Sequence, residues 1–341
     1  MALQSSGAIS LNDVNVELGN SGTANINMGS SAVRGLFGVS SGAITMNDGY
    51  GASSFVSITW GGGRGLFTIG ANSSSTPRRA IDYITVATTS NATNFGNLTQ
   101  SRRGPEGNSN GTRGLFAGGD TAANSSVTNI IDYVTIANTG NATDFGNLTV
   151  ARTHTGNASN GTRGVWAGGG ANNPSNIMDY VTISTTGNAV DFGNMYASQF
   201  GTGGCSNATR GLFGGQFQYG AAIEYITIAT TGNGTTFGNL TSGRPYPAAC
   251  SDATRGVFAG GVTTNTIDYV TVANTGNATD FGNLSQSKQI PGGLSDGITG
   301  LFAGGSQTNS IDYITIQTTG NSTDFGDLSL TCGDSTGVSG D

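Results

Sequence analysis

Apolar and polar positions along the chain recur in a fixed order. One apolar run ends in two glycines, as in "RGLFAGG" (Arg113–Gly119). A second run, "IDYVTI" (Ile131–Ile136), is rich in β-branched and aromatic residues, and a Gly-Asn turn then leads into "ATDFGNL" (Ala142–Leu148). Short β-prone runs separated by turn residues predict strands. No stretch keeps the 3.6-residue apolar period of an amphipathic helix, so we expect an all-β fold.

The same order occurs six times, in units of about 45 residues, a period typical of solenoids and propellers. Each unit has four β-prone runs and predicts one four-stranded antiparallel sheet. Ile, Tyr and Thr of "IDYVTI" point to one face, and Asp, Val and Ile point to the other, so both faces need cover. A closed ring of six such sheets supplies it, which predicts a six-bladed β-propeller over residues 54–341. The units are aligned on Tyr83, Tyr133, Tyr180, Tyr225, Tyr269 and Tyr313.

Two segments compete for one place in this ring. "FVSITWGGGRGLF" (Phe55–Phe67) can supply the first strand of blade one, and the tail "TCGDSTGVSGD" (Thr331–Asp341) also matches a first strand. The sequence therefore leaves open whether the surplus strand closes the propeller or packs outside it.

The repeat resembles a known motif. "GVWAGG…IMDYVTISTTGNAVDFGNM" is similar to a degenerate kelch motif, with four apolar residues, Gly-Gly, a later Tyr and an aromatic residue in the next strand. The resemblance covers roughly residues 54 to 329 and implies a propeller, but it implies no activity. Where kelch repeats have Trp, this chain has Phe95, Phe145, Phe192, Phe237, Phe281 and Phe325.

Residues 1–53 differ from the repeats and contain a duplication of their own, "SGAISLNDVNVELG" (Ser6–Gly19) and "SGAITMNDGYG" (Ser41–Gly51). The segment is too short for an independent core. It resembles N-terminal segments of tail-fibre and related tail proteins of tailed bacteriophages, and the repeats resemble those of phage structural proteins. The resemblance implies a virion protein, made in the host cytoplasm, that docks to the tail through this segment and turns its propeller outward.

The resemblance also implies partners, which are other virion proteins, a host-surface glycan or receptor, and further copies of this chain.

Composition disfavours two other classes of protein, nucleic-acid-binding proteins and membrane proteins. The net charge is −7, Lys288 is the single lysine, and the arginines are spread along the repeats, unlike the clustered cations of a nucleic-acid binder. No apolar run reaches the ~20 residues of a membrane span, and the N-terminus lacks the pattern of a signal peptide.

Few residues suggest catalysis or metal binding. His154 is the single histidine, so we expect a solvated residue and no zinc site. Glu106 is an acid outside the repeat pattern, with no identifiable partner. We therefore expect no enzyme, no cofactor and no metal, with a polysaccharide-degrading propeller as the less favoured alternative. Cys205, Cys250 and Cys332 are interpreted as free buried thiols at equivalent places in their repeats.

An acid and an arginine recur together, which predicts structural ion pairs rather than a ring of metal-binding carboxylates. Thr299 stands at the arginine position of unit six, so Asp312 is the acid expected to differ. The acids are Asp82, Asp132, Asp179, Glu224, Asp268 and Asp312, and the arginines are Arg64, Arg113, Arg163, Arg210 and Arg255.

Aromatic residues in units three and four depart from the repeat, where other units have small or polar residues. Adjacent units predict adjacent blades, so these side chains form a candidate binding surface for a sugar ring or a protein partner. Local packing is the alternative. They are Tyr196, Phe200, Phe217, Tyr219 and Tyr246.

Two candidate functions follow from the resemblance. One is a virion protein that binds the host surface or a fibre protein, and the other is a purely structural virion protein that binds only its neighbours.

Overall fold

The computed structural model describes residues 63–71, 76–122, 126–170, 174–217 and 220–340, and all of their regular structure is β-strand. The chain divides into two units, Met1–Thr59 and Trp60–Asp341, and the described residues belong to the second. The docking segment expected at residues 1–53 lies outside the described residues, so it and its boundary with a domain at 54–341 stay predictions.

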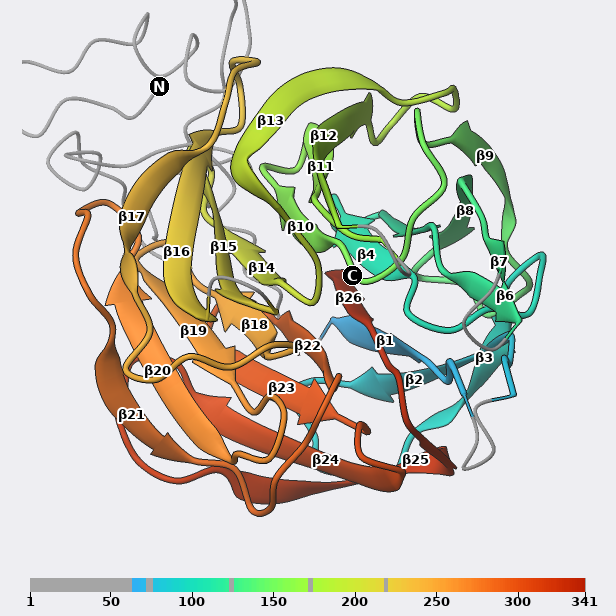
Figure 1. Cartoon of the computed structure of the whole chain (residues 1–341). Helices are drawn as coiled ribbons and strands as arrows, with labels where there is room; N and C mark the ends of the chain where they lie inside the picture. Colours follow the sequence, from blue (N-terminus) through green and yellow to red (C-terminus); the bar gives the residue numbers. More distant parts are fainter. Residues whose placement is uncertain (1–62, 72–75, 123–125, 171–173, 218–219, 341) are drawn as a thin grey trace, which may run out of the picture. The chain divides into compact units, whose positions relative to one another are not determined.

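Six four-stranded antiparallel sheets surround a central axis and form a six-bladed propeller (Figure 1). This confirms the predicted fold class. Blade 1 contains β26 (Gly337–Gly340), β1 (Arg64–Thr68), β2 (Ala80–Thr85) and β3 (Thr93–Asn97). Blade 2 contains β4 (Glu106–Ser109), β5 (Arg113–Ala117), β8 (Ile130–Thr135) and β9 (Thr143–Asn147), and the small hairpin of β6 (Asp120–Ala122) and β7 (Ser126–Val127) lies in its β5–β8 loop.

The other four blades have the same order. Blade 3 contains β10 (Gly156–Ser159), β11 (Arg163–Ala167), β12 (Ser175–Thr182) and β13 (Val190–Gln199). Blade 4 contains β14 (Gly203–Ser206), β15 (Arg210–Gln216), β16 (Gly220–Thr227) and β17 (Thr235–Asn239). Blade 5 contains β18 (Ala248–Ser251), β19 (Arg255–Ala259), β20 (Thr266–Thr271) and β21 (Thr279–Asn283). Blade 6 contains β22 (Gly292–Ser295), β23 (Thr299–Ala303), β24 (Thr308–Thr315) and β25 (Thr323–Cys332).

The C-terminal strand closes the ring. β26 occupies the innermost place of blade 1 and pairs antiparallel with β1, with Leu66 opposite Val338. Of the first strand expected at Phe55–Phe67, residues 55–62 lie outside the described residues, and Arg64–Thr68 form β1, the second strand of the blade. Of the two segments that could supply the first strand, the tail fills that place, which answers the question that the sequence left open.

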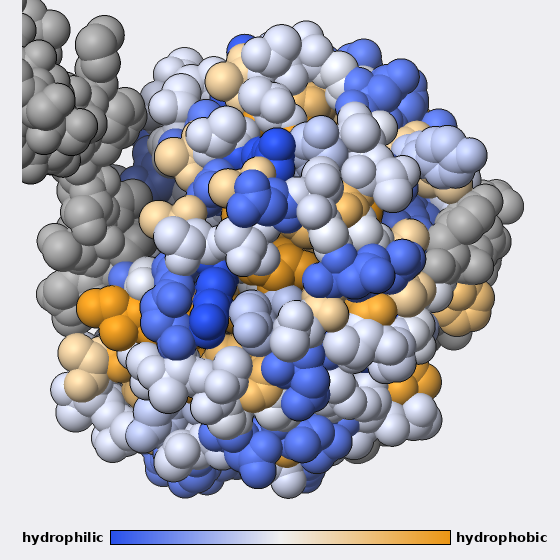
Figure 2. Space-filling view, turned by 90° about the vertical axis from the view of Figure 1, so that its left-hand side faces the viewer, coloured by the Kyte–Doolittle hydropathy of each residue, from blue (hydrophilic) through white to orange (hydrophobic). Residues whose placement is uncertain are grey.

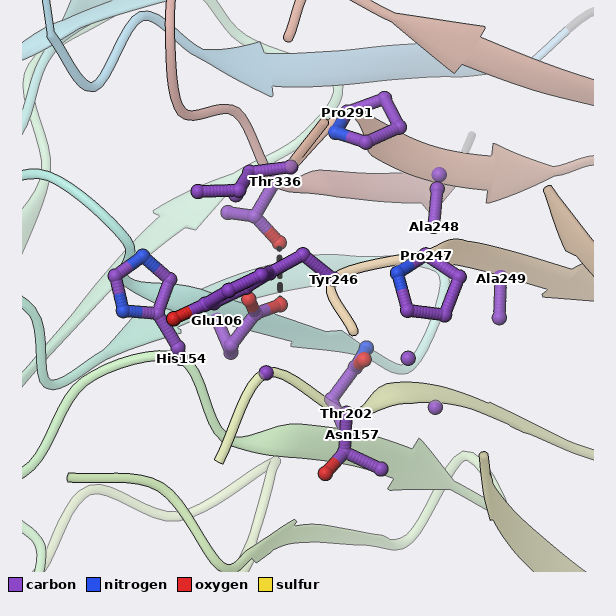
Figure 3. Close-up of a pocket in the computed structure, with 15 residues that line it drawn as sticks. Glu106, His154, Asn157, Thr202, Tyr246, Pro247, Ala248, Ala249, Pro291 and Thr336 are labelled. Atoms are coloured by element: carbon purple, nitrogen blue, oxygen red, sulfur yellow. Dashed lines mark hydrogen bonds between the residues drawn. The ribbon is translucent and has the colours of Figure 1, made fainter. Parts of the chain in front are cut away.

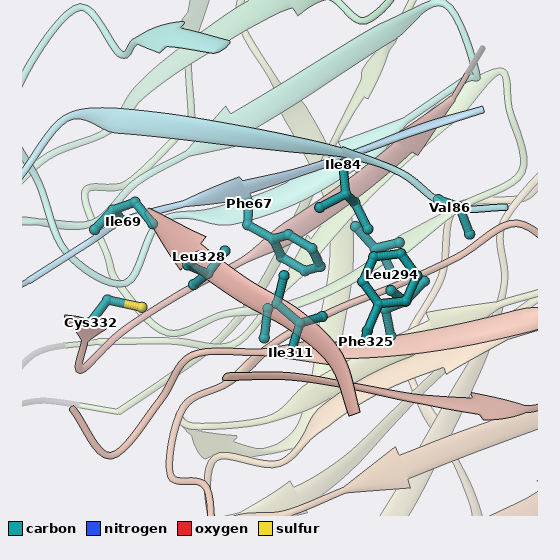
Figure 4. Close-up of a cluster of buried hydrophobic side chains, with 11 residues drawn as sticks. Phe67, Ile69, Ile84, Val86, Leu294, Ile311, Phe325, Leu328 and Cys332 are labelled. Carbon is teal, nitrogen blue, oxygen red and sulfur yellow. The ribbon is translucent and has the colours of Figure 1, made fainter. Parts of the chain in front are cut away.

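Each interface between consecutive blades, called a seam here, holds one hydrophobic cluster, and there are six clusters for six seams. Figure 4 shows the cluster between blades 6 and 1, where Phe67 and Ile84 pack with Ile311 and Phe325. Alternation along β2 places Ile81 in the opposite seam, between blades 1 and 2. The prediction that both faces of each blade are covered is therefore confirmed. Burial of these hydrophobic clusters stabilises the ring.

The repeated Gly-Asn turn also serves a seam. Asn97 donates its backbone N–H to the side-chain Oδ1 of Asn141 at 3.1 Å, and Gly140 donates its N–H to the carbonyl of Phe95 at 2.9 Å. The turn of one blade thus docks on the fourth strand of the preceding blade. The same backbone-to-asparagine bond joins Asn147 to Asn188, Asn194 to Asn233, Asn239 to Asn277, Asn283 to Asn321 and Asp327 to Asn91.

The recurring acids are buried, but the expected arginines are not their partners. Asp132 on β8 binds Arg102, which lies in the connection from blade 1 to blade 2, at 2.9 Å. Asp312 is also paired, but its partner is Lys288 at 3.2 Å, whereas Asp132, Asp179 and Asp268 each bind an arginine. The remaining buried pairs are Arg152–Asp179, Arg244–Asp268 and Lys288–Asp312.

The arginines before each apolar run have a different role. Arg113 stacks its guanidinium over the ring of Tyr133, 4.8 Å from the ring centroid, and donates to the carbonyl oxygen of Ser184 in blade 3 at 2.9 Å. It therefore covers one edge of a seam as a cation–π partner and a hydrogen-bond donor. Arg64, Arg163, Arg210 and Arg255 stack on the tyrosines of their own blades in the same way.

All three cysteines are free and buried, as expected. Burial raises the pKa of the Cys205 thiol to about 12 and that of Cys332 to about 11. Cys205 and Cys250 lie at the same place on the inner strands of blades 4 and 5. Cys332 does not share that place, because it ends β25 and stands three residues after Ser329, as Arg102 stands three residues after Thr99.

Candidate functional site

One face of the propeller carries the connections between blades together with the loops between second and third strands. We call it the connection face. The opposite face carries the turns between first and second strands and between third and fourth strands, and we call it the turn face. The distinction follows from antiparallel order within each blade. The inner strands begin at the connection face and end at the turn face.

Each of the six connections has one equivalent position shortly before the inner strand, and the residue type at this position varies among the blades. His154 (φ 53°), Tyr246 (φ 60°) and Ile290 (φ 58°) adopt the left-handed conformation there, which costs a non-glycine residue free energy. Glycine takes this conformation at the same position in two other connections. The complete set is Gly104, His154, Gly201, Tyr246, Ile290 and Asp334.

The glycines of this set make room for the rings of their neighbours. A Cβ atom on Gly104 would lie 2.6 Å from His154 Nε2, and one on Gly201 would lie 2.9 Å from the Tyr246 ring. The rings of His154 and Tyr246 have centroids 5.2 Å apart at an interplanar angle of 78°, an edge-to-face contact. Glycine and a ring-bearing residue alternate over four of the six positions, and Ile290 and Asp334 occupy the other two, so the six-fold pattern is broken here.

Four of these residues, His154, Gly201, Tyr246 and Ile290, line a small cavity (Figure 3). It lies at the connection-face end of the central channel that the six inner strands enclose, and we call it the channel mouth. Its walls include Glu106, His154, Tyr246, Ile290 and Thr336. The cavity volume is about 30 Å³, close to the space of one water molecule. It is far below the ~300 Å³ of the smallest ordinary ligand pockets, so it suits a single small polar group and not a sugar ring.

Glu106 is the acidic residue in the wall of this cavity. The corresponding positions in the other blades hold Gly156, Gly203, Ala248, Gly292 and Thr336. The Thr336 hydroxyl donates to Glu106 Oε2 at 3.1 Å, the dashed contact in Figure 3. Burial raises the pKa of Glu106 well above its ordinary value of 4.5, while the bond from Thr336 opposes the shift and the charge of Asp334 adds to it. Glu106 therefore has a partner, which the sequence did not identify.

His154 is buried, with 9% of its surface exposed, so the expected solvated histidine is wrong. Thr153 Oγ1 lies 3.2 Å from its Nδ1, and Asp334 Oδ1 lies 3.8 Å from its Nε2. No hydrogen-bond partner is present for Nε2 among the described residues.

The predicted aromatic surface is brought together in part. Phe217, 56% exposed, stacks on Phe200 with centroids 4.7 Å apart, and Phe200 lies 6.1 Å from Tyr246. We call Phe217, Phe200 and Tyr246 the aromatic row, and it leads from the β15–β16 loop to the channel mouth. Tyr219 lies outside the described residues.

Tyr196 is separate from these contacts. It is 82% exposed on β13, the outermost strand of blade 3, and it stands where other blades have a Thr or Ser. Thr99 illustrates the usual role of that position, since its hydroxyl donates to Asp132 at 2.6 Å. Tyr196 uses its backbone N–H to bind Glu224 at 2.9 Å, and Gln199 adds a bond at 3.2 Å. Among the described residues, the seam between blades 3 and 4 thus has no buried cation beside Glu224, and the Tyr196 side chain faces solvent.

The other end of the channel is more regular. A cavity of about 110 Å³ there is lined by all six inner strands. The Ser206 hydroxyl donates to the carbonyl oxygen of Ser159 at 2.7 Å, and the same bond links neighbouring strands around most of the ring. These hydroxyls already have partners within the ring, so this end is a structural element. The other bonds are Ser159 to Ser109, Ser251 to Ser206, Ser295 to Ser251 and Ser339 to Ser295.

Comparison with known proteins identifies no family, because no protein-family model matches the chain and no curated protein is significantly similar to it. The described residues include no helix long and apolar enough to cross a membrane. Within the same residues, no three His, Cys, Asp or Glu side chains are placed together to hold a metal ion. The propeller itself is consistent with a role in binding or adhesion, and its departures from six-fold symmetry locate the candidate surface.

Proposed function

We propose that this chain is a non-enzymatic binding protein that contacts its partner through the aromatic row on the connection face. The stacked pair of Phe217 and Phe200 carries the proposal. An exposed ring held flat by a second ring loses little conformational entropy on binding, which is the property of an anchor residue. Local packing explains Phe200 and Tyr246, which are partly buried, but it does not require more than half of Phe217 to face solvent.

The rest of the surface supports contact through isolated anchors. Figure 2 shows one side of the molecule, where polar and neutral residues cover most of the surface and hydrophobic residues form small groups. The large exposed hydrophobic residues of the described chain are few and spread over several blades. A surface that combines an exposed aromatic ring with hydroxyl and amide groups is typical of carbohydrate-binding sites and of polar protein interfaces. It is not typical of an obligate hydrophobic interface.

The finer proposal is a tail-associated protein of a tailed bacteriophage. It rests on the resemblance of the duplicated segment at residues 1–53 and of the repeats to phage tail proteins. In this proposal the N-terminal segment docks to the virion, several copies of the chain assemble there, and the propeller presents the connection face to a host-surface glycan or to a fibre protein. The runner-up is a structural virion protein that binds only its neighbours.

A polysaccharide-degrading enzyme is the weaker alternative. Glu106 has the raised pKa of a general acid, but the cavity beside it holds about one water and leaves no room for a glycosidic bond. The buried acids of the seams are committed to cations or amides. Binding without turnover is therefore the function that the geometry supports best.

The test uses the full-length chain with fluorescent labelling, a panel of bacterial cells and a glycan array. Phe217→Ser should reduce binding about tenfold or more, since an anchor aromatic contributes at least ~2 kcal/mol. Ile298→Ser is the matched control, because Ile298 is 68% exposed on a first-to-second-strand turn of the opposite face. Equal binding by Phe217→Ser and the wild type would end the proposal. Binding only to other virion proteins would favour the structural alternative.

A further inference from the structure

Several departures from the repeat meet in the seam between blades 3 and 4. Gln199 stands at the position of Arg102, and Glu224 stands at the position of Asp132. Glutamate is longer than aspartate, and Gly234 gives it room, because a Cβ atom on Gly234 would lie 2.5 Å from Glu224 Oε2. Other units have alanine or serine there. The three changes fit one another, so a coordinated set of residues replaces the ion pair of other seams.

Glu224 holds the last part of β13 in place. Its Oε2 accepts the Tyr196 N–H at 2.9 Å, and its Oε1 accepts from the Gln199 amide at 3.2 Å. β13 pairs with β12 as far as Gln199, so the chain is still extended there. Tyr196 and Ser198 are exposed, Gln199 is buried, and alternation places Phe200 on the same side of the strand as the two exposed residues.

An exposed aromatic ring lies at each end of this stretch. Four residues of extended chain place the Cα atoms of Tyr196 and Phe200 about 13 Å apart. Tyr196 is 82% exposed, and Phe217, which stacks on Phe200, is 56% exposed. We call Tyr196, Ser198, Phe200 and Phe217 the β13 rim. The span between its two rings is longer than one sugar ring, so a single partner that contacts both must be an extended chain.

No charged side chain belongs to the β13 rim. The sequence contains no charged residue from 192 to 209 or from 211 to 223. Glu224 and Arg244, in the adjoining strand and connection, are only 5% and 2% exposed. Asp191 lies at the opposite, turn-face end of β13. A charged partner would lose water here without compensation, so the rim fits an uncharged partner.

The geometry favours a carbohydrate over an extended peptide. A peptide strand could add to a free sheet edge, but the turn of blade 4 already occupies the edge of β13. Gly232 and Gly234 donate their N–H groups to the carbonyl oxygens of Phe192 and Asn194, each at 2.8 Å. Exposed flat rings with the small hydroxyl-bearing Ser198 between them suit the faces and hydroxyl groups of sugar rings.

We propose that the β13 rim binds a neutral oligosaccharide of several units, with one sugar ring on Phe217 and another on Tyr196. This inference rests on the proposed function, because it extends the contact at Phe217 and names the class of partner. It adds a second anchor residue, a minimum length and the absence of charge. Glu224 fixes the stretch of β13 between the two rings before binding, which preorganises the site.

The first test measures binding of the full-length protein to linear neutral oligosaccharides, from single sugars to hexasaccharides of hexoses and N-acetylhexosamines. Chains with uronic or sialic acids and a set of uncharged peptides are included. We expect neutral chains to bind, with affinity rising until the chain can reach both rings. The affinity should be the same at low and high NaCl concentration, since no charge takes part.

Three results of this test would overturn the inference. They are binding of acidic chains or peptides in place of neutral sugars, equal affinity for single sugars and long chains, and an affinity that falls as the NaCl concentration rises. The second of these would show that Tyr196 and Phe217 do not contact one chain.

The second test compares variants. Tyr196→Ser should weaken binding of the longest chain about tenfold and leave the shortest chain that binds unchanged, whereas Phe217→Ser should weaken both. Serine occupies the position of Tyr196 in blades 5 and 6, so we expect the variant to fold. Val190→Ser is the matched control, because Val190 is 54% exposed at the other end of the same strand.

Unchanged binding of every chain by Tyr196→Ser would overturn the inference. If Phe217→Ser still lost binding, the proposed function would stand without it. Equal binding by Phe217→Ser and the wild type would end the proposed function itself, so the two failures are distinguishable.

Discussion

Arg102 and Asp132 form an ion pair across the seam between blades 1 and 2, with Nη2 and Oδ2 2.9 Å apart and both side chains fully buried. The arginine also donates to the carbonyl oxygen of Phe116 at 3.0 Å, and the aspartate accepts from the Thr99 N–H at 3.0 Å. Removing one partner leaves a buried charge without compensation. The ion pair therefore links blade 2 to the chain segment that follows blade 1.

Replacing Arg102 with Met should lower the free energy of unfolding by about 3–5 kcal/mol. Arg79→Met is the matched control, since Arg79 is exposed, and it should change stability by no more than about 0.5 kcal/mol. Urea denaturation followed by tryptophan fluorescence measures both. An equally small effect of the two substitutions would show that the buried pair contributes little to the ring.

Two glycines of blade 2 should respond in opposite ways to the same substitution. A Cβ atom at Gly146 would lie 2.3 Å from the carbonyl oxygen of Gly187 in the next blade, and its φ is 146°. Gly140 has no atom within 4 Å of the corresponding point. Gly146→Ala should therefore destabilise the protein by roughly 2 kcal/mol or more, and Gly140→Ala by no more than about 0.5 kcal/mol. Thermal unfolding of the two variants compares them, and equal melting temperatures would contradict the seam geometry.

The pKa of Glu106 gives a pH-dependent prediction. Burial raises that pKa well above 4.5, so over a range of pH above this value the folded protein keeps a proton that the unfolded chain has lost. The free energy of unfolding then falls as the pH rises through this range, because the folded state binds more protons. Below the ordinary value both states are protonated and the effect is absent.

Glu106→Gln removes this titration while keeping an oxygen for the Thr336 hydroxyl. The difference in free energy of unfolding between variant and wild type should be smallest at about pH 4. As the pH rises toward 8, the wild type should lose stability relative to the variant. Denaturation at three pH values measures the difference, and Asp144→Asn serves as the exposed control. A difference in stability that does not depend on pH would exclude the raised pKa.

The sequence predicts the ring because its signal is repeated. Alternation in "IDYVTI" correctly assigns Ile81 and Ile84 to opposite seams, and the count of units gives the count of blades. The partner of Asp132 was missed because two cations recur with the acid. Arg102 has counterparts in Arg152, Arg244 and Lys288, and these bind the acids, whereas Arg113 recurs more regularly but stacks on Tyr133. Repetition shows which residues matter but not which of them meet.

The channel mouth was missed for the opposite reason. Its residues do not repeat, so they carry no periodic signal, and left-handed backbone at His154 is not visible in sequence. One signal was present, since Glu106 stands where other units have glycine, alanine or threonine. Phe200, Phe217 and Tyr246 were found because the same comparison of units was applied to aromatic residues. The contribution of β26 was left open, because "GVSG" has too little hydrophobic content to mark a strand by itself.

Closure of the ring by β26 joins blade 1 to its two neighbours, and the native thiols report on it. Cys332 is buried in the seam between blades 6 and 1, next to the connection that leads into β26. Cys205 is buried in the seam between blades 4 and 5, away from the closure. In the wild type neither should react with a thiol reagent until the protein unfolds, because both are buried and burial raises their pKa values.

The most direct measurement is the labelling rate of each thiol in Val338→Asp, read by mass spectrometry of peptides. Val338 is buried in the seam between blades 1 and 2, so a carboxylate there should detach β26 from the ring. We predict that Cys332 is labelled about tenfold faster or more than in the wild type while Cys205 stays protected. Equal acceleration of both thiols, or of neither, would contradict a propeller closed by its C-terminal strand.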